Sequence, residues 1–564
     1  MPVKSFAPLI AALFSCFTVF SQSDRIPLGN KQYNLLDRLD IKLQNDSVLS
    51  LSFVKPFNRK IVTQRVEWVD SVEKAGELPV KLSGVDRFNM HSLLMNNAEW
   101  TTDGGMAFRR EKPFLKYFFK TDAHLYESYS KDFSIVVDPV LNFQAGKSSK
   151  VDQSLFVNTR GISVRGNIIK KIGFYTYLTE NQERDPLFVQ QYTSAHDGIP
   201  GAGYYKTFKN NGYDYFDARG GIDFSASRFF NFRFGYDKLF LGNGYRSLLL
   251  SNFNNNFLYL QMDVHVKKFS YKSVYAELIA PFDSRTNRDT VRYKNYMAFH
   301  HLGFQVNRWL NLGVYENVFY NGRNGIELSY LNPVLFYRSI EMQLGSGNSK
   351  ATIGVDFKAN IKRTAQLYGQ LVIGEFFMKE LLRYNRGSWL NKQALQLGGK
   401  YIDVGGVKNL DLQVEANWVR PFMYTHSNSV TAFTHYNKEL AHPLGANFKE
   451  YIALLKYQPL NRLYLTAKLF YSEQGLDSAG QNMGNNLFVS YYTRPRDYDF
   501  FIGTGELAKR TQVSFSASYE FLQNLFADVN ISNRFYNIPT RSKRNEFFFS
   551  AGVRWNIDRR EFEF

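Results

Sequence analysis

The stretch FFFSAGVRWNI at residues 547–557 alternates in a period of two. Phe549, Val553 and Trp555 fall on one face of an extended chain, and Arg554 falls on the other. Successive side chains of a strand point to opposite faces, so the stretch predicts a strand with one apolar and one polar side. Its length is about the 9–11 residues with which a tilted strand crosses a bilayer.

The same alternation recurs from about residue 114 onward, most clearly at 230–237, 258–267 and 513–521. The chain holds 51 Phe and 36 Tyr, and its mean hydropathy is only −0.34. No apolar run after residue 22 approaches the ~20 residues of a membrane helix. We therefore predict an all-β protein: a transmembrane antiparallel outer-membrane β-barrel of about 18 strands over residues 113–564. A soluble propeller is disfavoured, because no repeat of about 40–50 residues is visible.

The connections between these runs come in two kinds. Short turns are expected at 227–228, 307–308, 361–363, 459–462 and 523–524. Long polar segments lie at about 183–216, 283–295, 320–349, 376–393, 420–447, 472–483, 494–510 and 536–544. Outer-membrane barrels have short periplasmic turns and long external loops, which predicts that the long segments are extracellular.

Residues 1–112 have a different character. Lys4 is the only charge before an apolar run that ends at Phe20, so residues 1–21 are predicted to be a signal peptide; lipidation at Cys16 is the alternative. Short helices are expected around 35–41 and 64–75, and a third begins at a capping box at Ser83–Asp86. We expect residues 22–112 to form a small helical segment in the periplasm or the barrel lumen, ordered only against the barrel.

Several short motifs resemble the capsule-assembly Wzi family. They are FGYDKLFLGNGYRSLLLS at 234–251, YLNP at 330–333 with Arg338, GVD at 354–356 and LYGQ at 367–370. Within these motifs the family positions of unassigned role are Gly242, Gly244, Arg246, Ser247, Asn332, Pro333 and Arg338. The branch that this chain resembles most is the gliding-motility protein RemB. The resemblance implies a non-catalytic outer-membrane barrel with an N-terminal helical plug that associates with capsular polysaccharide.

The formal charge of +18 favours an acidic partner. For an exported chain we expect acidic surface polysaccharide or lipopolysaccharide rather than nucleic acid, besides the lipid of the outer membrane. The leading hypothesis is a barrel that binds or organises surface polysaccharide. The alternatives are a component of gliding or secretion machinery that docks cell-envelope proteins, and a diffusion porin.

Aromatic faces pack on sugar rings, and Arg, Lys and Asn bind their hydroxyl and carboxylate groups. Candidate polysaccharide contacts in the long loops are Tyr204, Tyr205, Lys206, Tyr213, Tyr320, Arg323, Asn324, Tyr491, Arg494 and Arg496. A structural role for these residues, folded over the barrel mouth, is the competing interpretation. No catalytic motif or cofactor is predicted. No metal site is predicted either, since His300 and His301 should point to opposite faces of a strand.

Overall fold

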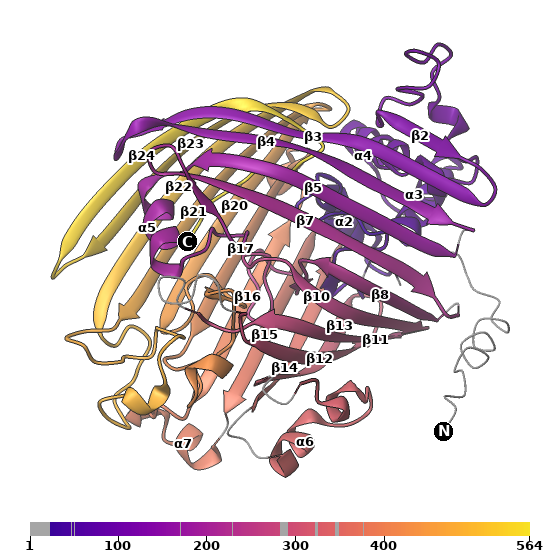
Figure 1. Cartoon of the computed structure of the whole chain (residues 1–564). Helices are drawn as coiled ribbons and strands as arrows, with labels where there is room; N and C mark the ends of the chain where they lie inside the picture. The colour runs from indigo at the N-terminus through magenta and orange to yellow at the C-terminus, as the bar shows by residue number, and fades with distance from the viewer. Residues whose placement is uncertain are drawn as a thin grey trace, which may run out of the picture.

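Eighteen antiparallel strands form a closed barrel in the computed structural model (Figure 1). The structure describes residues 23–46, 48–49, 51–169, 171–227, 229–282, 291–321, 325–344, 349–375 and 377–564. The expected signal peptide therefore lies outside the described residues, as do Arg323 and Asn324. Among the described residues, no helix has both the length and the apolar character needed to cross a bilayer.

Neighbours in sequence are neighbours in the barrel wall, and β24 closes it by pairing with β3. The strands of the wall are β3 (Phe133–Ser148), β4 (Val151–Ile168), β5 (Ile172–Arg184), β7 (Gly212–Ser225), β8 (Phe230–Asp237), β10 (Phe257–Val266), β11 (Phe269–Ile279), β12 (Lys294–Gln305), β13 (Leu310–Asn321), β14 (Ser349–Ile361), β15 (Ala365–Glu375), β16 (Lys392–Tyr401), β17 (Leu410–Val419), β20 (Phe448–Leu460), β21 (Leu463–Leu476), β22 (Glu506–Leu522), β23 (Leu525–Ile538) and β24 (Ser542–Trp555). Two short strands extend its edges: β2 (Tyr126–Tyr129) on β3, and β6 (Lys206–Phe208) on β7.

The outer face of the wall is an apolar belt. Phe515, Ile531 and Phe549 lie side by side on β22, β23 and β24, and their side chains are exposed. Arg554 of β24 points into the lumen, where it donates to Asp528 at 2.6 Å. The facing predicted for the terminal strand is thus confirmed. An exposed belt of this kind around a closed barrel is suited to lipid, because a closed wall leaves no backbone group unpaired in hydrocarbon.

Two ends of the barrel can be distinguished. The turn end carries short connections, including all five that the sequence predicts. The loop end carries the long ones, together with two short connections at 149–150 and 539–541.

Two predictions about the loops are wrong. The polar segment 536–544 is not a long loop, because β23 runs to Ile538 and β24 begins at Ser542, which leaves only residues 539–541 between them. The polar segments 472–483 and 494–510 are not separate loops, because residues 477–505 form a single connection between β21 and β22. Leu487, one of the apolar residues between these two segments, is buried in the interior instead of forming a strand.

Residues 23–108, here called the plug, occupy the turn end. Their helices α2 (Gln32–Leu43), α3 (Arg59–Lys74) and α4 (Gly84–Asn96) pack around a small apolar core, followed by η1 (Ala98–Trp100) and η2 (Met106–Phe108). The capping box opens α4 as predicted, with the Ser83 hydroxyl accepting from the Asp86 N–H at 2.9 Å. Figure 1 shows these helices together at one end of the barrel.

Ion pairs between the plug and lumen-facing side chains run around the wall. They join the plug to seven strands: Arg165–Glu99 (β4), Arg25–Asp223 (β7), Arg25–Asp263 (β10), Lys358–Asp40 (β14), Lys400–Asp37 (β16), Arg38–Asp411 (β17) and Lys31–Glu520 (β22). Such pairs replace the water that each charge would otherwise need. The plug is therefore held by the wall on several sides.

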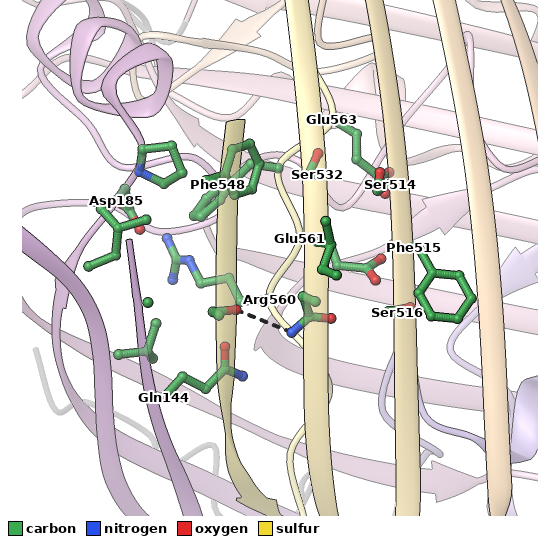
Figure 2. A pocket seen from close by; sticks show the side chains of 18 of the residues that line it. Gln144, Asp185, Ser514, Phe515, Ser516, Ser532, Phe548, Arg560, Glu561 and Glu563 are labelled. Atoms are coloured by element: carbon green, nitrogen blue, oxygen red, sulfur yellow. Dashed lines mark hydrogen bonds between the residues drawn. The ribbon is translucent and has the colours of Figure 1, made fainter. Parts of the chain in front are cut away.

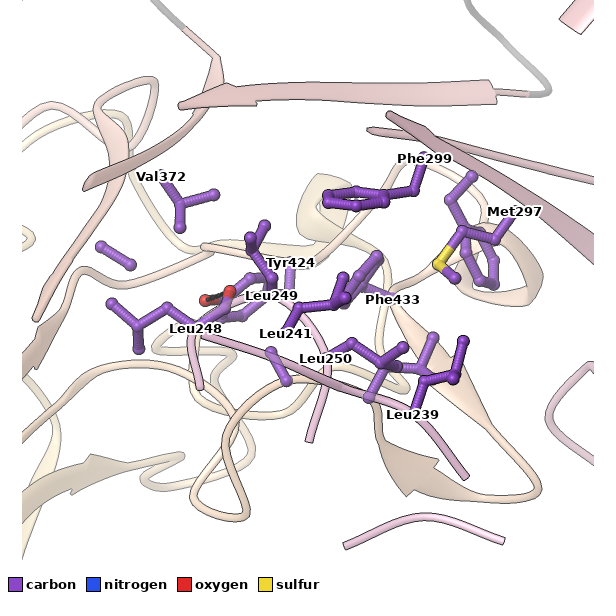
Figure 3. Packing of buried hydrophobic residues seen from close by; sticks show 14 of the residues in the cluster. Leu239, Leu241, Leu248, Leu249, Leu250, Met297, Phe299, Val372, Tyr424 and Phe433 are labelled. Carbon is purple, nitrogen blue, oxygen red and sulfur yellow. Dashed lines mark hydrogen bonds between the residues drawn. The ribbon is translucent and has the colours of Figure 1, made fainter. Parts of the chain in front are cut away.

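The connection 238–256, from the loop end, folds inward instead of outward. Its strand β9 (Phe240–Leu241) pairs with β1 (Val54–Lys55) of the plug. Figure 3 shows its leucines packed against Phe299 of the wall and Phe433 of the connection 420–447, which holds η7 (Ser429–Thr431) and the small hairpin β18 (Thr434–His435) and β19 (Lys438–Glu439). This apolar cluster fills part of the lumen.

A candidate ligand-binding vestibule

A cavity of about 1190 Å³ lies inside the barrel toward the loop end. We call it the vestibule. It lies between helix α5 (Leu187–His196), the connections that carry residues 437–444 and 485–488, and the lumen-facing sides of β21 to β24. Its polar and charged lining includes Lys150, Gln191, His196, Glu439, Gln474, Asn485, Asn486, Arg510, Arg534, Arg544 and Glu546.

Helix α5 is fixed over the vestibule by the wall. It begins after Pro186, where a proline costs no helix hydrogen bond. The Glu546 carboxylate of β24 accepts from the backbone N–H of Leu187 at 2.7 Å and of Phe188 at 3.3 Å, and from the Ser148 hydroxyl at 2.7 Å. A carboxylate at a helix N-terminus satisfies free donors and complements the helix dipole.

Three arginines give the vestibule a basic wall. Arg510 donates to Glu450 at 2.8 Å, and Arg544 donates to the Gln191 side chain at 3.0 Å. In the described part of the chain, Nε and Nη1 of Arg510 and Nε of Arg534 are buried without a hydrogen-bond partner. Guanidinium donors left free in this way suit a carboxylate or phosphate ligand.

Aromatic rings of α5 and of the 477–505 connection also line the vestibule. Tyr192 and His196 of α5 stack with their ring centroids 3.9 Å apart, and Phe488 meets His196 edge-on at 5.8 Å. The Tyr192 hydroxyl donates to Glu439 at 2.8 Å, so this ring is held in place. Aromatic faces beside basic donors are the combination that binds sugar rings bearing acidic groups.

His196 is a titratable residue of this lining. Burial alone would lower its pKa, and Lys438 acts in the same direction. The Glu439 carboxylate, 3.7 Å from Nε2, outweighs both and holds the pKa of His196 above its ordinary value. The charged form of His196 is thus favoured in the folded vestibule.

Residues 557–564 follow β24 and run into the lumen, where Phe564 lines the vestibule. The Glu563 side chain binds Lys468 at 2.6 Å, and the Arg534 guanidinium donates to the backbone oxygen of Phe564 at 3.1 Å. Figure 2 shows Arg560, Glu561 and Glu563 against the wall strands, around a pocket of about 100 Å³.

Phe564 also lines a second cavity of about 620 Å³ nearer the plug. Its ring packs edge-on against Phe188, Tyr192 and Phe253, at 5.6, 4.8 and 5.2 Å. Phe564 therefore lies between the vestibule and the deeper cavity.

The sequence-predicted contacts in the segment 198–216 lie away from the vestibule, and one of them, Tyr213, belongs to the wall strand β7. Tyr204 and Lys206 are exposed, whereas Tyr213 is buried and packs edge-on against Tyr205 at 5.0 Å. None of the four lines the vestibule.

The sequence-predicted contacts of the 477–505 connection form a separate cluster. The Arg494 guanidinium lies 3.8 Å above the Trp389 ring, and Tyr491 packs against the same ring at 4.9 Å. Arg496 is exposed near Phe500. This cluster holds two neighbouring loops together, so the structure gives Tyr491 and Arg494 a packing role.

Tyr320, Asn332, Pro333 and Arg338 are not near the lumen. Tyr320 is an outward-facing residue of β13 and is buried under part of the connection to β14, with its ring 4.9 Å from that of Tyr330. The other three belong to that connection.

The family motif at 242–247 lies in the interior. Gly242 has φ 140°, and a Cβ there would approach Nε2 of Gln370 to 2.5 Å, which explains the glycine. The backbone N–H groups of Tyr245 and Arg246 donate to Glu415, and the Ser247 hydroxyl donates to the Leu241 carbonyl at 2.6 Å. A Cβ at Gly244 would also collide with Glu415. Of the sequence-predicted residues, Arg246 alone lines one of the described cavities, the deeper one.

Sequence reasoning missed the vestibule itself. Arg510 and Arg534 follow the lumen-facing parity of their strands, near the ends that lead to the long loops. That parity was readable from the alternation, but which polar faces surround a cavity depends on the loops that fill the rest of the lumen.

The described residues hold no group of three or more His, Cys, Asp or Glu side chains placed to bind a metal. The adjacent histidines do face opposite ways: His300 contacts Glu316 at 3.2 Å on the outside, and His301 contacts Asp356 at 2.7 Å in the lumen.

No family model and no curated protein matches this sequence. Among solved structures, OprD from Pseudomonas aeruginosa aligns with 74% of this chain and 94% of its own, at a TM-score of 0.40 and 10% identity. OccAB2 from Acinetobacter baumannii aligns with 76% and 99%, at 0.40 and 11%. Wzi from Escherichia coli, described as a carbohydrate-binding β-barrel of the outer membrane involved in group 1 capsule assembly, aligns with 96% of this chain and 99% of its own, at 0.54 and 13%. Along nearly its whole length, this chain is thus similar in fold to the Wzi barrel.

Proposed function

We propose that this chain is a non-enzymatic outer-membrane barrel that binds acidic surface polysaccharide in the vestibule. The observation that carries the proposal is that unpartnered Arg510 and Arg534 donors and the Tyr192–His196 stack line the same cavity. Uronic acids and similar sugars offer both a carboxylate and a ring face. The carbohydrate binding described for Wzi and the shared fold support this choice.

The proposal also fixes an orientation. The loop end and the vestibule face the outside, and the plug faces the periplasm, as in barrels with short periplasmic turns. An epitope inserted after Gln481, in the 477–505 connection, is then reachable by antibody on intact cells. One inserted at Asn524, in a tight turn, is not. The reverse labelling pattern would invert the orientation.

Binding is tested with purified protein and two commercial glycans: polygalacturonate, which is acidic, and dextran, which is neutral. We expect polygalacturonate to bind and dextran not to. Arg544→Ala removes a charged donor at the vestibule rim, and should weaken binding about tenfold.

The matched control is Lys543→Ala. Lys543 is the preceding residue of β24 and points to the other face of the wall, so it removes the same charge outside the vestibule. If both variants lost the same affinity for polygalacturonate, general charge attraction would explain the binding. Equal binding of both glycans would contradict the proposal.

The plug weighs against a diffusion porin, because its ion pairs reach many strands of the wall. The resemblance to the gliding-motility branch keeps a protein-docking role as the second candidate. Capture of a cell-envelope protein by the intact barrel, together with absent glycan binding, would favour that role.

A further inference from the structure

The outer wall of the barrel carries polar groups where its apolar belt should continue. On β13 the outward residues Leu312 and Val314 are exposed, and the next residue of the same facing is Glu316. Its side chain is 3% exposed and meets the imidazole of His300, on neighbouring β12, at 3.2 Å. Glu316 is the seventh of the twelve residues of β13. Since about 9–11 strand residues cross a bilayer, this carboxylate lies at hydrocarbon depth.

Residues 325–344, here called the cap, cover these groups. The cap contains η4 (Leu328–Leu331) and helix α6 (Tyr337–Leu344). Glu316 accepts from the backbone N–H of Tyr337 and of Arg338, both at 2.7 Å, and the Tyr337 ring stacks on His300 at 4.3 Å. The first turn of α6 thus satisfies a carboxylate that water cannot reach.

The irregular part of the cap is also bonded to the wall. Tyr271 and Tyr275 of β11 point outward, and their hydroxyls donate to the carbonyl oxygens of Pro333, at 2.5 Å, and Leu331, at 2.8 Å. Backbone that is not helical is tolerated at membrane depth only where its polar groups are satisfied by protein. These two bonds meet that requirement for part of the cap.

The other side of the cap is exposed and mostly apolar, with Asn332, Arg338, Ser339 and Gln343 as its exposed polar residues. Its charged side chains are engaged close by: Glu327 accepts from the Ser329 hydroxyl at 2.8 Å, and Arg338 pairs with Glu341. The exposed apolar side chains, from 37% to 89% accessible, are Ile326, Leu328, Leu331, Val334, Leu335, Phe336, Met342 and Leu344.

We propose that the cap is a membrane-embedded element, with this apolar side immersed in the acyl chains of the leaflet at the loop end. We infer that lipid covers this side because the side continues the apolar belt of the barrel wall. The cap covers the outward-facing residues Ala298 of β12 and Val318 of β13, whereas the neighbouring belt residues Val314 and Val355 stay exposed. The apolar side chains of the cap take the place of the covered wall. The polar contacts then face the barrel, and the apolar residues face lipid, as in other interfacial segments.

This placement reverses the expectation for a long loop. Instead of reaching into solvent, the cap broadens the barrel within the membrane plane. Figure 1 shows α6 outside the strands, on the side of the barrel away from the plug helices.

The test measures the depth of single spin labels in the full-length barrel in phospholipid vesicles. Cys16 is the only cysteine, so Cys16→Ser gives a clean background. Labels are placed by Val334→Cys and Met342→Cys, where exposed side chains leave room for the nitroxide. Ile531→Cys, in the apolar belt, is the lipid reference, and Gln481→Cys, in the 477–505 connection, is the solvent reference.

We expect the labels at 334 and 342 to be relaxed by dissolved oxygen and protected from a water-soluble nickel chelate, as the label at 531 is. Relaxation by the chelate, as at 481, would overturn the proposal. Protection from both, with dipolar broadening between labels, would show a second copy of the chain on this face and would also overturn it.

A second measurement tests the anchor. Glu316→Ala removes the acceptor for the first turn of α6. The label at 334 should then gain mobility, while the label at 531 keeps its spectrum. An unchanged spectrum at 334 would mean that Glu316 does not hold the cap.

Discussion

Docking of the plug can be probed at one buried ion pair. The Asp40 carboxylate of α2 binds Nζ of Lys358 on β14 at 2.8 Å, and it also accepts from Gln366 at 3.0 Å. The side chains of Lys358 and Asp40 are 3% and 8% exposed. Asp40→Ala therefore leaves an ammonium group buried in the lumen without its counter-charge.

Breaking such a pair from one side costs about 3–5 kcal/mol. Lys358→Met leaves the carboxylate alone and should cost a similar amount. The double variant removes both charges, so its cost should be far smaller than the sum of the two. A coupling of about 1–3 kcal/mol is the expected signature of neighbouring residues.

The cost is expected in undocking of the plug rather than in unfolding of the wall. The assay is hydrogen exchange of residues 32–43 in the folded barrel, followed in the wild type and the three variants. Exchange in each single variant should accelerate by roughly two to four powers of ten, at about 1.4 kcal/mol per tenfold. Additive effects in the double variant, or acceleration confined to β14, would refute the reasoning.

Three further predictions concern the belt, the vestibule and the plug. Ile531→Arg places a charge in the lipid-facing belt and should reduce stability by about 2–4 kcal/mol, seen as lost heat-modifiable folding on gels, whereas Ile531→Leu should fold normally. The pKa of His196 is raised in the folded protein. The stabilisation that protonated His196 gives to α5 should therefore be complete below the unfolded pKa, about 6.5, and should be lost as the pH rises through the folded pKa. Hydrogen exchange of residues 187–196 should therefore accelerate with pH beyond the intrinsic trend, and His196→Gln should abolish the excess. The fragment 23–108 alone should show no cooperative melt, since its charged side chains pair with the wall; a sharp transition would show an independent domain.

The barrel could be predicted because its signal is local. Alternation within Phe547–Trp555 sets the facing of a strand without reference to any other part of the chain. Asn524, with φ 61°, occupies a tight turn that its residue type permits. The capping box at Ser83 is likewise a contact between residues three apart.

The candidate contacts could not be placed in the same way. Tyr320 and Tyr204 look alike in sequence, yet one is buried under the cap and the other is exposed. The difference depends on where a long connection packs. Arg246 lies in a connection that folds into the lumen because Glu415, which is 169 residues away, accepts from its backbone N–H. Contacts of that range leave no periodic trace in the sequence.

The contents of the lumen and its wall differ in connectivity. The plug precedes β3 and residues 557–564 follow β24, and both adjoining strand ends lie at the turn end. Neither insertion passes through the mouth at the loop end. Either one can leave the lumen without separating a pair of wall strands, because its links to the wall are made by side chains and by single backbone groups. The cylinder can thus be completed first and filled afterwards, and no threading step limits its assembly.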